Sequence, residues 1–166
     1  MVIIRDGVAP TQKKSVEKEI KAFLDACPNI KLTFLILNKK TAVKVFLEEA
    51  NGFRNIPPGT LVDNSIVDKN KFEFFLISQK SNQGLPQPTH YEVIYDDNSC
   101  RAEDLHLFAY KMCYLYYNWT GSIKIPSACQ YAKKLAFLVG DKLSTKGEII
   151  VPGERFNTQT RSLYFL

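Results

Sequence analysis

The sequence predicts one domain of the α/β class, and three observations support this prediction. The chain has 166 residues, of which 45% are hydrophobic and 23% charged, as in a single globular domain. Residues 2–37 read as a strand, a helix and a strand, which is the order of a parallel βαβ crossover. Further strand-like and helix-like segments follow, and no linker rich in Pro, Gly or Ser divides the chain.

The opening unit combines two strand patterns with one helix pattern. A β-rich run at residues 2–4 forms the first strand. Residues 31–37 (KLTFLIL) are apolar almost throughout, as in a strand that is covered on both faces. Residues 11–26 between them form a helix, whose apolar stripe consists of Val16, Ile20, Phe23 and Leu24. The two strands are therefore expected to be parallel neighbours joined by a right-handed crossover.

The middle of the chain favours strands separated by loops. Residues 41–50 have no single assignment, because the alternation of Val43 and Val45 favours a strand while the Ala and Glu content favours a helix. The strand candidates are residues 61–67, 72–78 and 91–95, and the turn-rich loops are residues 51–59 and 83–89.

Two helices are predicted after these strands. The first covers residues 102–117, and its expected buried stripe consists of Leu105, Phe108, Ala109, Met112 and Leu115. The second begins at Ser127, a good N-cap residue after Pro126, and extends to about residue 143. The final apolar residues, 163–166 (LYFL), are expected to pack against another part of the protein.

Composition and charge limit the environment and the partners of the protein. The formal net charge of +5 and the 12% aromatic content favour a polyanionic partner, although only weakly. The longest apolar runs are far shorter than the ~18 residues of a membrane span, and charge interrupts the N-terminal segment MVIIRDG. We therefore expect no membrane segment and no signal peptide. The four cysteines are Cys27, Cys100, Cys113 and Cys129. They form no CxxC pair, and we interpret them as reduced thiols of a cytoplasmic or nuclear protein.

A few polar and aromatic residues are candidates for a functional site. Asp6 directly follows an apolar strand, at the end where α/β sheets bind ligands, so its carboxylate could hold a metal ion. The Asp6-Gly7 pair equally fits a turn that caps the next segment. The cluster of aromatic and amide residues at 114–119 fits either base stacking or core packing. His90 has no Ser or Cys nucleophile pattern beside it and is interpreted as a structural, hydrogen-bonded histidine.

Six segments, taken in order, resemble the C-terminal half of the PIWI domain of Argonaute/Piwi proteins, and they favour the Piwi branch. They are IIRDGV (3–8), PPGTLVD (57–63), FEFFLISQ (72–79), QGLPQPTHYEVIYDD (83–97), YKMCYLYYNWTG (110–121) and IPSACQYAKKLAFLVG (125–140), with the terminal LYFL in addition. The resemblance covers essentially residues 1–166. It implies an α/β, ribonuclease H-like PIWI fold that is incomplete, because the N-terminal strands of that domain are absent.

The resemblance also implies a metal-dependent reaction. In the family, two Mg²⁺ ions hold the scissile phosphate of an RNA that is paired with a guide strand. By motif matching, Asp6 is the second catalytic aspartate and a Mg²⁺ ligand, and Lys133 stands where most members have a histidine. The first aspartate and an upstream glutamate have no counterpart in this sequence, and a protonated lysine cannot bind Mg²⁺. We therefore expect this chain alone not to cleave RNA.

Guide and target RNA are the partners that the resemblance implies, together with the remaining half of the PIWI domain and the neighbouring MID domain. The α-carboxylate of Leu166 is implied to help bind a metal ion at the 5′-phosphate of the guide. The residues that match guide-contacting positions are Lys39, Lys40, Lys44, Gln79, Gln83, Tyr116, Asn118, Lys124 and Gln130. Such contacts to the backbone position a strand without reading its sequence. Two alternatives remain open: a truncated product without a folded function, and a non-catalytic module that binds a protein partner.

Overall fold

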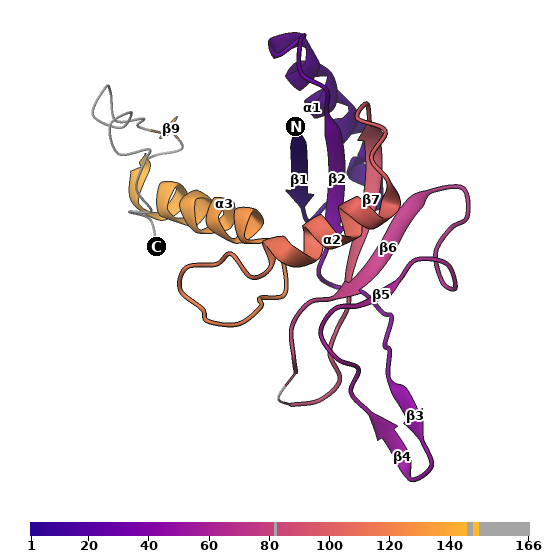
Figure 1. Ribbon diagram of the computed structural model, residues 1–166. Coiled ribbons are helices and arrows are strands. Elements are labelled where there is room, and N and C mark those ends of the chain that lie inside the picture. Colours follow the sequence, from indigo (N-terminus) through magenta and orange to yellow (C-terminus); the bar gives the residue numbers. More distant parts are fainter. Residues whose placement is uncertain (82, 146–147, 150–166) are drawn as a thin grey trace.

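The computed structural model describes residues 1–81, 83–145 and 148–149, which form a mixed sheet with helices on both faces (Figure 1). Five strands build the main sheet in the order β1-β2-β7-β6-β5. Their bounds are β1 Val2–Asp6, β2 Thr33–Asn38, β5 Thr60–Val62, β6 Phe72–Ile77 and β7 Thr89–Asp96. The helices are α1 Lys13–Ala26, α2 Ala102–Met112 and α3 Ser127–Leu138. None of the described helices is long and apolar enough to cross a lipid bilayer.

The opening βαβ unit is confirmed. β1 and β2 are parallel, with Asp6 opposite Leu37, and α1 connects them. The strands β2, β7, β6 and β5 then pair antiparallel, so the sheet is mixed. Parallel pairing brings the carboxyl ends of β1 and β2 to the same edge, and this edge carries Asp6.

Both faces of the sheet are apolar and covered, which explains the almost continuous hydrophobicity of β2. On the face that carries α1, Phe34 and Ile36 pack with Val16 and Ile20 of the helix. On the face that carries α2 and α3, Leu37 packs with Ala109 and Cys129 among others. Successive residues of a strand point to opposite faces, so a strand between two cores needs apolar side chains at every position.

The helix after β7 is shorter than its periodicity predicts. α2 ends at Met112, and the amide of Ile123 donates a hydrogen bond to the carbonyl of Cys113, so the chain turns back here. Leu105 and Ala109 are buried as expected, but Leu115 lies beyond the helix and is 62% exposed. Phe23 and Phe108 are also partly exposed, at 40% and 36%. These aromatic side chains extend the apolar stripe of their helices beyond the width that the sheet covers.

The segment without a clear assignment forms part of a separate hairpin. β3 (Leu47–Glu49) and β4 (Gly52–Arg54) pair only with each other and project from the main sheet (Figure 1). The strand interpretation of residues 41–50 is therefore right for its last part. The amide of Asn55 donates a hydrogen bond to the carbonyl of Gly84 at 2.9 Å, which ties the hairpin base to the loop before β7. After α3, one wide helical turn covers Val139–Leu143, and two-residue strands follow: β8 (Ser144–Thr145) and β9 (Glu148–Ile149).

Candidate nucleic-acid interface

An ion pair joins the ends of β1 and β2. The ammonium group of Lys39, just after β2, contacts Oδ2 of Asp6, the last residue of β1. The other carboxylate oxygen, Oδ1, is buried and has no hydrogen-bond partner in the described part of the chain. The side chains of Lys39 and Asp6 are only 30% and 24% exposed. The pair is therefore partly shielded from water, which strengthens its attraction relative to a pair on the open surface.

Helix α3 approaches Asp6 through Cys129. The Sγ of Cys129 lies 3.8 Å from the carbonyl oxygen of Ile4 on β1. Burial, and next the negative charge of Asp6, raise the pKa of Cys129 to about 12. The thiol therefore stays protonated at neutral pH. A protonated thiol is a poor metal ligand, because metal ions bind the thiolate.

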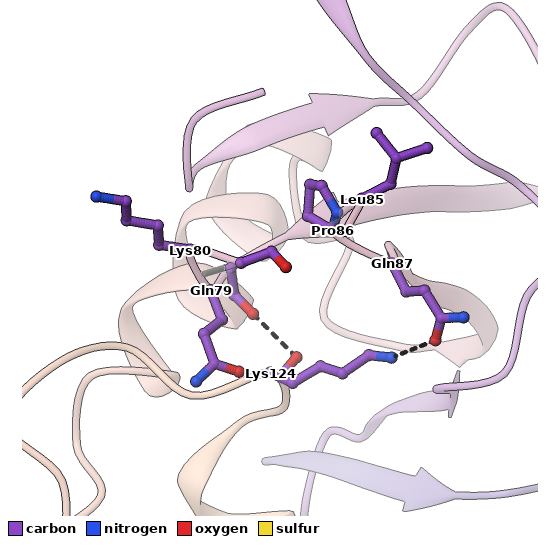
Figure 2. Close-up of a pocket in the computed structure, with 8 residues that line it drawn as sticks. Gln79, Lys80, Leu85, Pro86, Gln87 and Lys124 are labelled. Atoms are coloured by element: carbon purple, nitrogen blue, oxygen red, sulfur yellow. Dashed lines mark hydrogen bonds between the residues drawn. The ribbon is translucent and has the colours of Figure 1, made fainter. Parts of the chain in front are cut away.

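Lys124 crosses a pocket of about 380 Å³ (Figure 2). The Nζ of Lys124 donates to the backbone carbonyl of Lys39 at 2.9 Å and to Oε1 of Gln87 at 3.2 Å. Burial, followed by the positive charge of Lys39, lowers the pKa of Lys124. The residues that line the pocket are Ser78, Gln79, Lys80, Ser81, Leu85, Pro86, Gln87 and Lys124.

Two strands fix the backbone of Lys124. Ser78, just after β6, donates its hydroxyl to the carbonyls of Ile123 and Lys124, each at 2.9 Å. Thr89, at the start of β7, donates to the carbonyl of Lys124 at 3.1 Å. The connector that carries Lys124 is therefore tied to the sheet at this point by three hydrogen bonds.

The pocket carries positive charge that no carboxylate neutralises. Among the described residues, no Asp or Glu oxygen lies within ion-pair distance of Lys124 or of Lys80. The partners of Lys124 are instead a carbonyl and a side-chain amide, both neutral. A half-buried cation with neutral partners attracts an anion from solution, and amide side chains such as Gln79 can donate hydrogen bonds to the same anion.

Comparison with known proteins identifies the family. A family model described as the Piwi domain matches residues 1–144. The chain belongs to the Piwi domain family. It is 35% identical over 158 residues to Piwi-like protein 1 of Gallus gallus, an alignment that covers 91% of this chain and 18% of that protein. This Piwi-domain chain therefore spans less than a fifth of the length of that relative.

Solved structures confirm the ribonuclease H-like PIWI fold. The crystal structure of Drosophila Piwi matches with a TM-score of 0.69 and 34% identity, over 84% of this chain and 20% of that one. The structure of Kluyveromyces polysporus Argonaute with a guide RNA matches with a TM-score of 0.70 and 25% identity, over 86% of this chain and 20% of that one. Both matches place the described sheet and helices within a Piwi or Argonaute lobe.

Family membership implies the use of a divalent metal, and the described Piwi-domain residues do not by themselves fit one. No group of three or more His, Cys, Asp or Glu side chains comes together in the described part of the chain. Asp6 is the carboxylate that ends β1, and Lys39 is paired with it. Mg²⁺ is usually bound by about six oxygen ligands from carboxylates, substrate phosphates and water. A single carboxylate that is already paired with a lysine does not provide enough ligands or negative charge to hold it.

The other residues matched to the Piwi family lie in different environments. Lys133 is exposed on α3, one turn after Cys129, and its Nζ lies 5.7 Å from the centre of the Phe137 ring. No hydrogen bond or ion pair joins Lys133 to Asp6, whose ion pair is with Lys39. Lys40 lines a second pocket of about 450 Å³ that also includes Gly7 and His90.

The expected guide-contacting residues divide into accessible and buried ones. Tyr116 is buried, with its ring 5.4 Å from that of Tyr131, so its side chain belongs to the packed interior. Gln79 lines the Lys124 pocket. The exposed members are Lys44, Gln83 and Asn118, and Gln130 is half-buried on α3. Leu166 lies outside the described residues.

The sequence interpretation of His90 is supported, and several pocket residues were missed. His90 lies 3.1 Å from the carboxylate of Glu73, in the sheet, as expected of a structural histidine.

The sequence did not predict that Ser78, Lys80 and Gln87 line the Lys124 pocket. Gln87 stands between two prolines in a loop, which would have been its only signal, whereas nothing near Ser78 in the sequence indicates its contact with Lys124.

Proposed function

We propose that this chain is the C-terminal half of a PIWI domain and that it binds RNA as part of a Piwi-type, guide-RNA silencing protein. In this role it contacts the sugar–phosphate backbone of a small guide RNA and of the complementary target. The observation that carries the proposal is the fixed, half-buried ammonium group of Lys124, which has only neutral partners beside a pocket of about 380 Å³.

Phosphate is the anion that fits this pocket best. Lys124 supplies a charge, Lys80 a second one at the rim, and Gln79 and Gln87 supply amides that donate hydrogen bonds. Lys40 and Lys44, together with Gln83, Asn118 and Gln130, extend this surface as further backbone contacts. The charged members of this surface are all lysines, which contact phosphates as point charges, so binding should depend mainly on the backbone and little on sequence. The neighbouring Argonaute structure, which holds a guide RNA, supports nucleic acid as the partner class.

Cleavage of the target needs groups from outside the described residues. Asp6 would supply one carboxylate to a divalent-metal site, and Lys133 would lie beside the phosphate on α3. Further carboxylates would have to come from the other half of a PIWI domain. The α-carboxylate of Leu166 would contribute to a second metal site, at the guide 5′-phosphate next to a MID domain. The chain by itself is therefore proposed as a binding element and not as a nuclease.

RNA binding by the purified protein tests this proposal. Fluorescence anisotropy with a labelled 20-nucleotide oligouridine should give an affinity that falls as salt rises, because phosphate contacts release counterions. Lys124→Gln should weaken binding several-fold and reduce the salt slope by about one. Lys21→Gln, which removes the same charge from the exposed face of α1, is the matched control and should change little. Equal effects of the two variants would mean that only net charge matters.

A further inference from the structure

Lys39 connects the two parts of the candidate interface. Its ammonium group contacts Oδ2 of Asp6, while its backbone carbonyl accepts a hydrogen bond from Nζ of Lys124. One residue therefore touches both the carboxylate at the end of β1 and the cation that crosses the pocket. No other residue of the described chain bonds to both of these side chains.

The ammonium group of Lys39 is attracted by Asp6 and repelled by Lys124. Asp6 attracts it, and Lys39 is the only hydrogen-bond partner of that carboxylate among the described residues, since Oδ1 has none. Lys124 repels it, and the same repulsion contributes to the lowered pKa of Lys124. An anion in the Lys124 pocket would remove this repulsion and offer Lys39 a second acceptor, because the flexible four-carbon stem of a lysine can reorient towards a phosphate.

Other ion pairs of the sheet do not share this position. Glu92 holds Lys13 through both carboxylate oxygens, at 2.6 and 2.9 Å, on the face that carries α1. Glu73 pairs with His90, whose ring also packs against Phe75. Neither of these two pairs includes a residue that is hydrogen-bonded to Lys124, whereas the backbone carbonyl of Lys39 accepts a hydrogen bond from it. Lys39 is the described cation that can exchange a protein carboxylate for a ligand bound there.

We propose that Lys39 is shared between Asp6 and a phosphate of RNA bound beside Lys124, so that RNA binding releases the Asp6 carboxylate. The inference rests on the proposed function and specifies how the same site is regulated. Asp6 and RNA compete for one ammonium group. By linkage, whatever neutralises Asp6 in place of Lys39 strengthens RNA binding, and RNA makes Asp6 more available to another cation.

A double-mutant cycle on RNA affinity tests this competition. Binding of the labelled oligouridine is measured in EDTA, so that no divalent cation takes part. Asp6→Asn frees Lys39 and should tighten binding about twofold to fivefold, the range expected when such an ion pair no longer competes. In the Lys39→Met background the same Asp6→Asn change should give no gain, because the contested ammonium is absent. Asp25→Asn, which removes an exposed carboxylate at the end of α1, is the charge control.

The outcomes separate this inference from the proposed function. If Asp6→Asn binds like the unmodified protein, or if its gain persists in the Lys39→Met background, the sharing of Lys39 is wrong although RNA binding stands. If the unmodified protein binds no RNA, the proposed function itself fails. Salt dependence supplies a measurement that does not need the Asp6 variant to fold. The salt slope of the unmodified protein should exceed that of Lys39→Met by about one, and equal slopes would show that Lys39 stays with Asp6.

Discussion

The hydroxyl of Tyr91 lies in the core without an oxygen or nitrogen partner in the described structure, so its removal should stabilise the protein. Tyr91 is 0% exposed, and its ring stacks on Phe74 with 4.8 Å between the ring centres. Its nearest polar neighbours are the thiols of Cys113 and Cys129, which are weak hydrogen-bond partners. Burial raises the pKa of Tyr91 well above its usual value, so the hydroxyl stays neutral.

The size of this effect follows from the cost of burying a hydroxyl without a good partner, about 1–3 kcal/mol. The thiols offset part of this cost, and the loss of one oxygen leaves a small gap beside Phe74. We therefore expect Tyr91→Phe to raise the free energy of unfolding by about 1 kcal/mol, or the melting temperature by about 2–4 °C. Urea and thermal unfolding followed by circular dichroism measure both quantities.

Tyr131→Phe is the matched control for this substitution. The hydroxyl of Tyr131 accepts a hydrogen bond from the amide of Tyr117 at 2.8 Å and donates one to the carbonyl of Leu115 at 3.1 Å. Its removal should therefore destabilise the protein by about 1 kcal/mol. A loss of about 1 kcal/mol or more in Tyr91→Phe would refute the reasoning, because it would show that the buried hydroxyl has a strong partner.

Four further outcomes are expected. Lys39, Lys40 and Lys44 follow β2, and replacing all three with Ala should flatten the salt slope of RNA binding by roughly one for each lysine that contacts a phosphate. An unchanged slope would show that these lysines only face solvent. Burial raises the pKa of Cys113 to about 11 and that of Cys129 to about 12, so both thiols should resist iodoacetamide at pH ~8. In the unfolded state these thiols ionise at a lower pH than in the folded state, so the free energy of unfolding should fall as pH rises above about 9. Thermal melts between about pH 8 and 11 measure this effect, and a melting temperature that does not change with pH would contradict it. Burial lowers the pKa of His106, so the stability that the neutral imidazole contributes is present above pH ~6.5 and is lost as pH falls below this value. The melting temperature of His106→Phe should therefore depend less on pH between about 7.5 and 5 than that of the unmodified protein.

Hydrophobic periodicity was sufficient to predict the opening of the fold. Val16 and Ile20 recur at helical spacing, and the continuous apolar run of β2 indicated a strand covered on both faces, as the two core clusters show. The same periodicity failed at Leu115, because a local pattern cannot show where the sheet beneath a helix ends. The turn at Cys113 depends on a hydrogen bond from Ile123, ten residues further along the chain.

The candidate site was less predictable than the fold, because its contacts join distant segments. The motif that contains Asp6 indicated its place at a strand end, but its pairing with Lys39 follows from the parallel register of β1 and β2. Lys124 could be named from family resemblance, whereas its anchoring requires Ser78 and Thr89 from two other strands. Tyr116 matched an RNA-contacting position, yet its burial against Tyr131 could not be read from an aromatic-rich segment alone.

The projecting β3–β4 hairpin offers a place for labelling the protein. Its two strands pair only with each other, and the turn at residues 50–51 is exposed. Lengthening such a turn costs little loop-closure entropy, since each doubling of loop length adds only about 0.6 kcal/mol. A short epitope or a dye-binding peptide inserted between Ala50 and Asn51 would leave the five-stranded sheet untouched. The hydrogen bond from the side-chain amide of Asn55 to the carbonyl of Gly84 lies at the opposite end of the hairpin from this turn, so the insertion would leave the link between the hairpin base and the loop before β7 in place.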